Sequence, residues 1–134
     1  MSNELILAIS GNDIFSGGGL HADLATYTTN KQHGFVAVTC LTAMTEHGFE
    51  VIPVDPTTFA QQLNSLKDVP FSAIKLGLLP NVQVADLALD YVKAHAEIPV
   101  VLDPVLVCKE SHDVEVSALR DELIKFLSLI HISE

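Results

Sequence analysis

Short apolar runs alternate with longer amphipathic stretches along this chain of 134 residues. The apolar runs suit buried strands, which we predict at residues 4–10, 35–41, 73–79 and 98–102. The amphipathic stretches predict helices at residues 18–32, from Thr57 or Thr58, from Asn81, and after residue 116. Residues 42–56 and 103–116 are predicted to be loops. This alternating order implies an α/β protein with a parallel sheet and helices on both faces.

A glycine-rich segment follows the first predicted strand and is a candidate ligand site. Gly11 and Gly17–Gly19 permit close approach of the backbone, and the next helix directs unpaired N–H groups past the strand end. A tight turn without a ligand is the plain alternative. Gly17, Gly19 and Ala22 match the spacing of a dinucleotide-binding fingerprint, but six residues separate them from the strand. The Lys-Ser/Thr pair of a P-loop is absent, so neither motif identifies the ligand.

Parallel sheets bind ligands beyond the carboxyl ends of their strands. That rule gathers four segments into one candidate site, namely Gly11–Gly19, Thr42–His47, Gly77–Pro80 and Asp103–Ser111. Three side chains in or near these segments have both a functional and a plain interpretation. Asp23 either contacts a ligand or faces the helix dipole. Met44 and Cys108 either face the site or fill the core.

Composition excludes several classes of function. The net charge is −10 with only seven Lys and Arg residues, which argues against nucleic-acid binding. No apolar run approaches a membrane span, and no secretory signal is visible, so we expect no membrane partner and a cytoplasmic location. Cys40 and Cys108 lie far apart and suit free thiols. The six histidines lack zinc-ligand spacing, so we expect no metal ligand from them, and no G-x-S-x-G elbow occurs.

Four motifs, in order, resemble the ribokinase-like vitamin kinases, in particular the hydroxymethylpyrimidine kinase branch that includes bacterial pyridoxal kinases. They are Gly11-Asn12-Asp13 with Gly17–Asp23, Thr39–Met44, Lys75–Pro80 and Val100–Lys109. The resemblance extends from about residue 4 to about residue 126. The family transfers the γ-phosphate of ATP to a hydroxymethyl group on an aromatic heterocycle. The resemblance therefore implies a small-molecule substrate, ATP and Mg2+, and it is compatible with a homodimer.

The resemblance also implies roles for individual residues. Gly11 and Asp23 belong to the pocket that holds the ring, and Val107 and Cys108 lie on the loop that covers it. Met44 stands where the pyrimidine kinases of thiamine synthesis carry Gln. A thioether packs on a pyridine ring but cannot hydrogen-bond an aminopyrimidine edge, so Met44 favours pyridoxal. The chain departs from the family at Ile14-Phe15-Ser16, where Ser-Ser-Gly or Pro-Ser-Gly is common.

The family's chains are about twice as long as this one, and their second half supplies the glycine-rich anion hole, the catalytic region and most of the ATP–Mg2+ pocket. We therefore expect residues 1–126 to be the amino-terminal half of a truncated kinase domain, without catalytic residues and inactive alone. Residues 127–134 resemble a translated sequencing adapter and are predicted to be a non-native tail. A short edge strand is the alternative for these residues.

Three interpretations of function remain open at this point. The first is a kinase of pyridoxal, pyridoxine and pyridoxamine in vitamin B6 salvage. The second is a hydroxymethylpyrimidine/phosphomethylpyrimidine kinase of thiamine biosynthesis. The third is a non-catalytic small-molecule binding domain, and a dehydrogenase is a distant fourth.

Overall fold

The computed structural model describes residues 4–15 and 17–102. Helices and strands alternate along most of this part of the chain. Their order is β1 (Leu5–Ser10), α1 (Gly19–Thr29), β2 (His33–Val38), β3 (Cys40–Thr45), β4 (Gly48–Pro53), α2 (Pro56–Ser65), β5 (Ala73–Leu76), α3 (Val82–Ala94) and β6 (Val100–Leu102).

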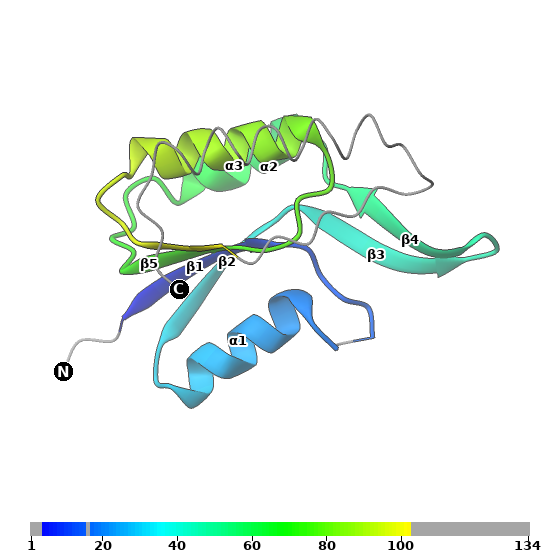
Figure 1. Ribbon diagram of the computed structural model, residues 1–134, viewed down its shortest axis with the longest axis horizontal. Coiled ribbons are helices and arrows are strands. Elements are labelled where there is room, and N and C mark those ends of the chain that lie inside the picture. Colours follow the sequence, from blue (N-terminus) through cyan, green and yellow to red (C-terminus); the bar gives the residue numbers. More distant parts are fainter. Residues whose placement is uncertain (1–3, 16, 103–134) are drawn as a thin grey trace.

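A parallel sheet forms the centre of the fold, with strand order β2-β1-β5-β6. Helices α2 and α3 cover one face of this sheet and α1 covers the other (Figure 1). The handedness of parallel connections explains this division. The step from β1 to β2 and the step from β5 to β6 run in opposite directions across the sheet, so right-handed crossovers place their helices on opposite faces. The predicted parallel sheet with helices on both faces is confirmed.

The predicted loop at residues 42–56 is wrong, because β3 and β4 form an antiparallel hairpin there. This hairpin extends beyond the parallel sheet (Figure 1). Its turn is closed by Gly48, whose φ of 100° suits glycine. Phe49-Glu50-Val51 alternates apolar and polar residues, which is typical of a strand, but Pro53 and Asp55-Pro56 favour a loop in the sequence.

The predicted strand at residues 35–41 is divided between two sheets at Thr39, which is fully buried. The Thr39 N–H donates to the Ser10 carbonyl at 2.9 Å, and its carbonyl accepts from the Val54 N–H at 2.9 Å. Its hydroxyl donates to the Leu78 carbonyl at 2.7 Å. These bonds hold Thr39 to the segments of Ser10, Val54 and Leu78, and the chain leaves the parallel sheet at this residue.

The remaining predicted boundaries need smaller corrections. Helix α1 ends at Thr29 rather than residue 32, and α2 begins at Pro56, one or two residues before the predicted Thr57 or Thr58, with Asp55 as its N-cap. The predicted Asn81 cap of α3 is confirmed, since its side chain accepts from the Val84 N–H at 2.9 Å. Strands β5 and β6 are shorter than the predicted 73–79 and 98–102. The predicted last helix and the tail lie outside the described residues.

The main apolar core lies between the sheet and the pair α2–α3. Its fully buried side chains come from β1, β5 and both helices, and include Leu7, Ile9, Phe59, Ile74, Leu76, Val84 and Val92. The opposite face of the sheet, under α1, is more polar and contains the buried Asp23. The candidate site lies at the end of this polar face.

Candidate functional site

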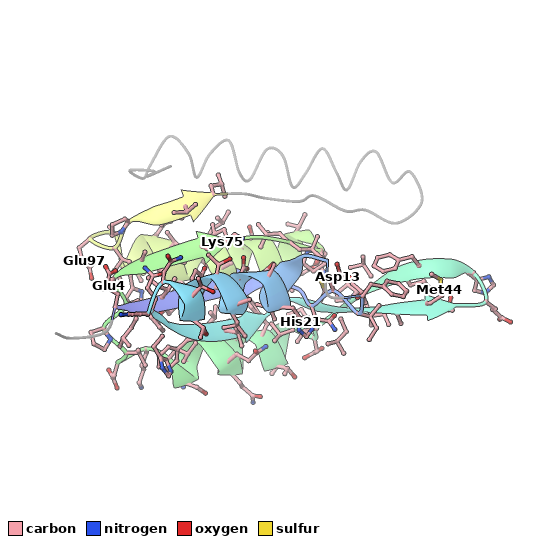
Figure 2. The ribbon with its side chains drawn as sticks, turned by 90° about the horizontal axis from the view of Figure 1, so that it is seen from below. Glu4, Asp13, His21, Met44, Lys75 and Glu97 are labelled. Carbon is pink, nitrogen blue, oxygen red and sulfur yellow. The ribbon has the colours of Figure 1, made fainter. Side chains whose placement is uncertain are left out.

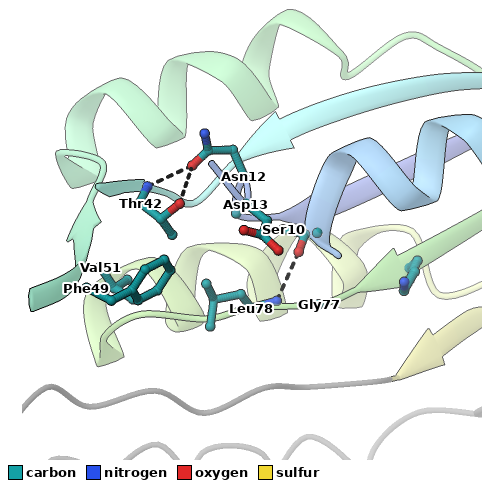
Figure 3. Close-up of a pocket in the computed structure, with 11 residues that line it drawn as sticks. Ser10, Asn12, Asp13, Thr42, Phe49, Val51, Gly77 and Leu78 are labelled. Carbon is teal, nitrogen blue, oxygen red and sulfur yellow. Dashed lines mark hydrogen bonds between the residues drawn. The ribbon is translucent and has the colours of Figure 1, made fainter. Parts of the chain in front are cut away.

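A pocket of about 270 Å³ opens at the carboxyl ends of β1 and β5, between the glycine loop and the hairpin. Figure 3 shows its lining side chains. The lining residues come from four segments, namely Ser10–Asp13 with Gly19, Thr42, Phe49 with Val51, and Lys75 with Gly77 and Leu78. Three of the four segments that sequence reasoning brought together, 11–19, 42–47 and 77–80, therefore meet at this pocket. The fourth, Asp103–Ser111, lies outside the described residues.

Close backbone packing shapes the floor of the pocket. A Cβ atom on Gly11 would lie 2.3 Å from the Cys40 sulfur and 3.0 Å from Leu78 Cδ2, so any other residue there would displace the Cys40 side chain. The Leu20 N–H, in the first turn of α1, donates to the Gly11 carbonyl at 3.1 Å. Burial raises the pKa of the Cys40 thiol, which keeps it protonated and unsuited to nucleophilic chemistry. Cys40 is thus a packing residue behind the pocket.

Hydrogen bonds join the glycine loop to the hairpin. The Asn12 side-chain oxygen accepts from the Thr42 N–H at 2.7 Å (Figure 3). The Thr42 hydroxyl oxygen in turn accepts from the Ile14 N–H at 2.9 Å. The Asn12 N–H also donates to the Cys40 carbonyl at 3.2 Å. Because the bonds run in both directions, the loop and the hairpin form one continuous side of the pocket.

A charged residue, Lys75, lies within β5 of the sheet (Figure 2). Its ammonium forms an ion pair with Asp23 of α1, a residue that is only 7% exposed. Asp23 Oδ1 receives this bond, while Oδ2 is buried without a partner among the described residues. Lys75 lines the pocket and Asp23 lies behind it. Lys75 is the one cation among the described lining residues.

Tyr27, one turn after Asp23 on α1, gives a test of this charged environment. Burial, and then the negative charge of Asp23, raise the pKa of the Tyr27 phenol from 10.0 to about 12. The folded protein thus holds this proton more tightly than the unfolded chain. We expect the resulting stabilisation to be complete below pH 10 and to disappear as the pH rises through 12.

Tyrosinate absorbance of a Tyr91→Phe variant, which leaves Tyr27 as the single tyrosine, measures this directly. A native-state midpoint near the ordinary value of 10.0 would contradict the assignment. Tyr27→Phe is the matched variant in the stability measurement, and it should lose less stability than the parent chain across the same pH range.

The structure places the predicted site residues at different distances from the pocket. Gly11 lines it, Asp23 reaches it only through Lys75, and Met44 lies on the hairpin with 61% of its surface exposed. Val107 and Cys108 lie outside the described residues. Their roles in substrate binding stay predictions.

Sequence reasoning missed four lining residues, Ser10, Phe49, Val51 and Lys75, which lie outside the predicted segments. A signal existed for Lys75, because it is the single charged residue in the apolar run 73–79. The two hairpin residues were missed because the hairpin itself was predicted to be a loop.

The residues described hold no cluster of three or more His, Cys, Asp or Glu side chains that could bind a metal ion. In the same ranges, no helix is both long and apolar enough to cross a membrane.

A parallel sheet with its pocket at the strand ends, bordered by a separate hairpin, defines an α/β domain of the ribokinase-like class. The phosphomethylpyrimidine kinase family matches residues 13–132. This match spans most of the sequence, so the chain belongs to the phosphomethylpyrimidine kinase family.

Individual relatives agree with this assignment. The chain is 34% identical over 138 residues to the pyridoxine kinase of Bacillus subtilis (strain 168), covering 97% of this chain and 51% of that protein. It is 32% identical over 136 residues to the hydroxymethylpyrimidine/phosphomethylpyrimidine kinase of Synechococcus elongatus, with coverage of 97% and 51%. The chain therefore spans about half the length of the curated relatives it matches.

Solved structures show the same partial coverage. The Bacillus subtilis pyridoxal kinase in its ADP complex superposes with a TM-score of 0.83 at 32% identity, covering 95% of this chain and 49% of that one. The Staphylococcus aureus pyridoxal kinase bound to pyridoxal gives 0.81 at 29% identity, with coverage of 95% and 46%. The resemblance to vitamin kinases is thus confirmed.

Proposed function

We propose that this chain forms the ring-binding part of an ATP-dependent kinase that phosphorylates the hydroxymethyl group of pyridoxal, pyridoxine and pyridoxamine. The observation that supports this most is the pocket at the carboxyl ends of β1 and β5. Its floor is bare glycine backbone, its hairpin side carries the apolar Phe49 and Val51 beside Thr42, and Lys75 is its single described cation. Such a pocket suits a flat ring with a few polar substituents.

Met44 supports the choice of a B6 vitamer as substrate. It lies on β3 directly opposite Phe49 of β4, and Phe49 lines the pocket. Neighbours of this kind share one face of a hairpin, so Met44 extends the apolar surface that begins at Phe49. A thioether contributes packing but no strong hydrogen bond to an amino group.

The second candidate is a hydroxymethylpyrimidine/phosphomethylpyrimidine kinase. The family description and the Synechococcus elongatus relative favour it, and that relative is nearly as similar as the Bacillus subtilis pyridoxine kinase. Both candidates transfer the γ-phosphate of ATP to a hydroxymethyl oxygen, with ADP as the leaving group. A phosphomethylpyrimidine kinase also transfers it to an oxygen of the phosphate group that the pyrimidine already carries. They differ in the polar edge of the ring.

ATP enters this proposal as the phosphate donor. Solved relatives include pyridoxal kinases in complex with ADP and with AMP-PCP. Mg2+ neutralises phosphate charge in such reactions, but the described residues offer no matching set of ligands. We therefore assign none of them to Mg2+, nor to the transfer step itself. The proposal places the protein in the cytoplasm, where a thiol such as Cys40 stays reduced.

Turnover of pyridoxal, pyridoxine and hydroxymethylpyrimidine by the full-length protein with ATP tests the proposal. We expect the B6 vitamers to be preferred, and Met44→Gln to shift the preference several-fold toward the aminopyrimidine through one added hydrogen bond. Leu41→Gln on the same strand is the control for a general effect of the substitution, because Leu41 is 51% exposed and alternates to the opposite face of the hairpin. Preference for the pyrimidine would favour the second candidate.

A polypeptide of residues 1–134 alone is expected to bind the ring without ATP-dependent turnover. Measurable turnover by this polypeptide would contradict that expectation. Ring binding without phosphorylation by the full-length protein would instead indicate a non-catalytic binding domain.

A further inference from the structure

Two aromatic side chains stand together where the glycine loop meets the hairpin. Phe15 belongs to the loop and Phe49 to β4, and their ring centroids lie 6.2 Å apart with an interplanar angle of 28°. This geometry is an offset stack. Both rings are exposed, Phe15 to 65% and Phe49 to 48%. Phe49 lines the pocket, whereas Phe15 does not.

The backbone around each ring holds the pair in place. The Phe15 N–H donates to Asp13 Oδ1 at 3.0 Å, which closes a local turn. The preceding residue, Ile14, is tied to Thr42 of the hairpin. On the other side, the antiparallel register sets Phe49 opposite Met44. The two rings are therefore positioned relative to one another without a ligand.

The orientation of the hairpin directs Phe49 toward the pocket. Side chains alternate between the two faces of a strand, so Phe49 and Val51 share one face and Ile52 lies on the other. The facing residues Thr42 and Val51 form a cross-strand pair, and both line the pocket. Figure 3 shows Phe49 and Val51 together on this side of the pocket. Phe49 is the aromatic member of this face.

We propose that Phe49 is the stacking surface for the heteroaromatic ring of the substrate, and that Phe15 is a positioning residue that holds the Phe49 ring. This inference rests on the proposed function. One face of the Phe49 ring is occupied by Phe15. The substrate ring would therefore stack on the other face of Phe49, from the side of the pocket. Aliphatic alcohols have no π face and gain nothing from such a surface, so the pair selects flat heterocycles.

Fluorescence gives the most direct test, because the chain contains no tryptophan. Phe49→Trp introduces a single indole at the proposed stacking position. We expect saturable quenching when pyridoxal or pyridoxine is added to the full-length protein. Ile52→Trp places the same fluorophore on the opposite face of β4, where Ile52 is 45% exposed, and its emission should not change. Equal responses of the two variants would overturn the inference.

Kinetics of leucine variants supply the second readout. Phe49→Leu is expected to raise KM and the dissociation constant for pyridoxal about three- to tenfold, with kcat nearly unchanged, because stacking acts on bound substrate and transition state alike. Phe15→Leu should give a smaller rise in KM, and Phe15→Tyr should restore it. Ile52→Ala is the matched control and should leave both constants unchanged.

The outcomes separate this inference from the proposed function. If the parent protein binds and phosphorylates the ring while Phe49→Leu keeps its affinity, the stacking role is wrong and the proposed function stands. If the parent protein neither binds nor phosphorylates any of the heterocycles, the proposed function fails and the stacking role fails with it.

Discussion

Gly19→Ala is expected to lower the free energy of unfolding by about 2–5 kcal/mol, the sum of a left-handed backbone penalty and a steric collision. Gly19 has a φ of +61°, and an added Cβ would lie 2.5 Å from the Gly11 carbonyl oxygen. That oxygen accepts the hydrogen bond from the Leu20 N–H, so the collision also disturbs the start of α1. Thermal unfolding should show a loss of roughly 10 °C.

Two matched glycine variants separate the causes of this effect. Gly48→Ala tests positive φ alone, because its φ is +100° and nothing lies within 4 Å of the added Cβ. Gly17→Ala tests the loop without a left-handed φ, and its nearest neighbour would be Asp13 Oδ2 at 3.3 Å. We expect both variants to lose less stability than Gly19→Ala. Equal losses in Gly19→Ala and Gly48→Ala would show that the collision contributes nothing.

Lys75→Met should destabilise the protein by about 3 kcal/mol, the lower end of what removing one partner of a buried ion pair costs. The side chain of Lys75 is 27% exposed and that of Asp23 is 8% exposed, so solvent screens the pair only in part. Without Lys75, neither carboxylate oxygen of Asp23 has a partner among the described residues, since Oδ2 already lacks one. Urea unfolding of the variant measures the loss.

The double variant Asp23→Leu/Lys75→Met is the control for this interpretation. Apolar residues of similar volume often replace a buried ion pair with little loss of stability. We therefore expect the double variant to be more stable than Lys75→Met alone. The single variant Asp23→Leu completes the comparison. If the double variant loses as much free energy of unfolding as Asp23→Leu and Lys75→Met lose together, the charges act independently and the ion pair does not couple α1 to β5.

The sequence was sufficient to predict the parallel sheet, because β1 and residues 73–79 are short, mostly apolar runs bounded by polar, glycine or proline residues. It was also sufficient for the Asn81 cap, a local interaction between neighbouring residues. It was insufficient at Thr39, where three long-range hydrogen bonds end one strand and begin another. Such bonds leave no periodic pattern in the chain.

The candidate site shows the same division between local and long-range causes. Gly11 was predicted to be in the pocket from the strand–glycine pattern, and it is a lining residue. The resemblance assigned Asp23 to the pocket that holds the ring, and this role stays a prediction. Its ion pair with Lys75, 52 positions away in the chain, could not be predicted from local pattern. The pairing of Phe15 with Phe49 likewise depends on the hairpin, which was not predicted.

The bonds among Asn12, Ile14 and Thr42 have a consequence for protein engineering. The glycine loop and the hairpin are separated by about 30 positions in the chain, yet each supplies a hydrogen-bond acceptor to the other. A transplanted loop without Asn12 would leave the Thr42 N–H without this acceptor, and a hairpin without Thr42 would leave the Ile14 N–H without its acceptor. Chimeric enzymes within this family should therefore exchange the two segments as a single cassette.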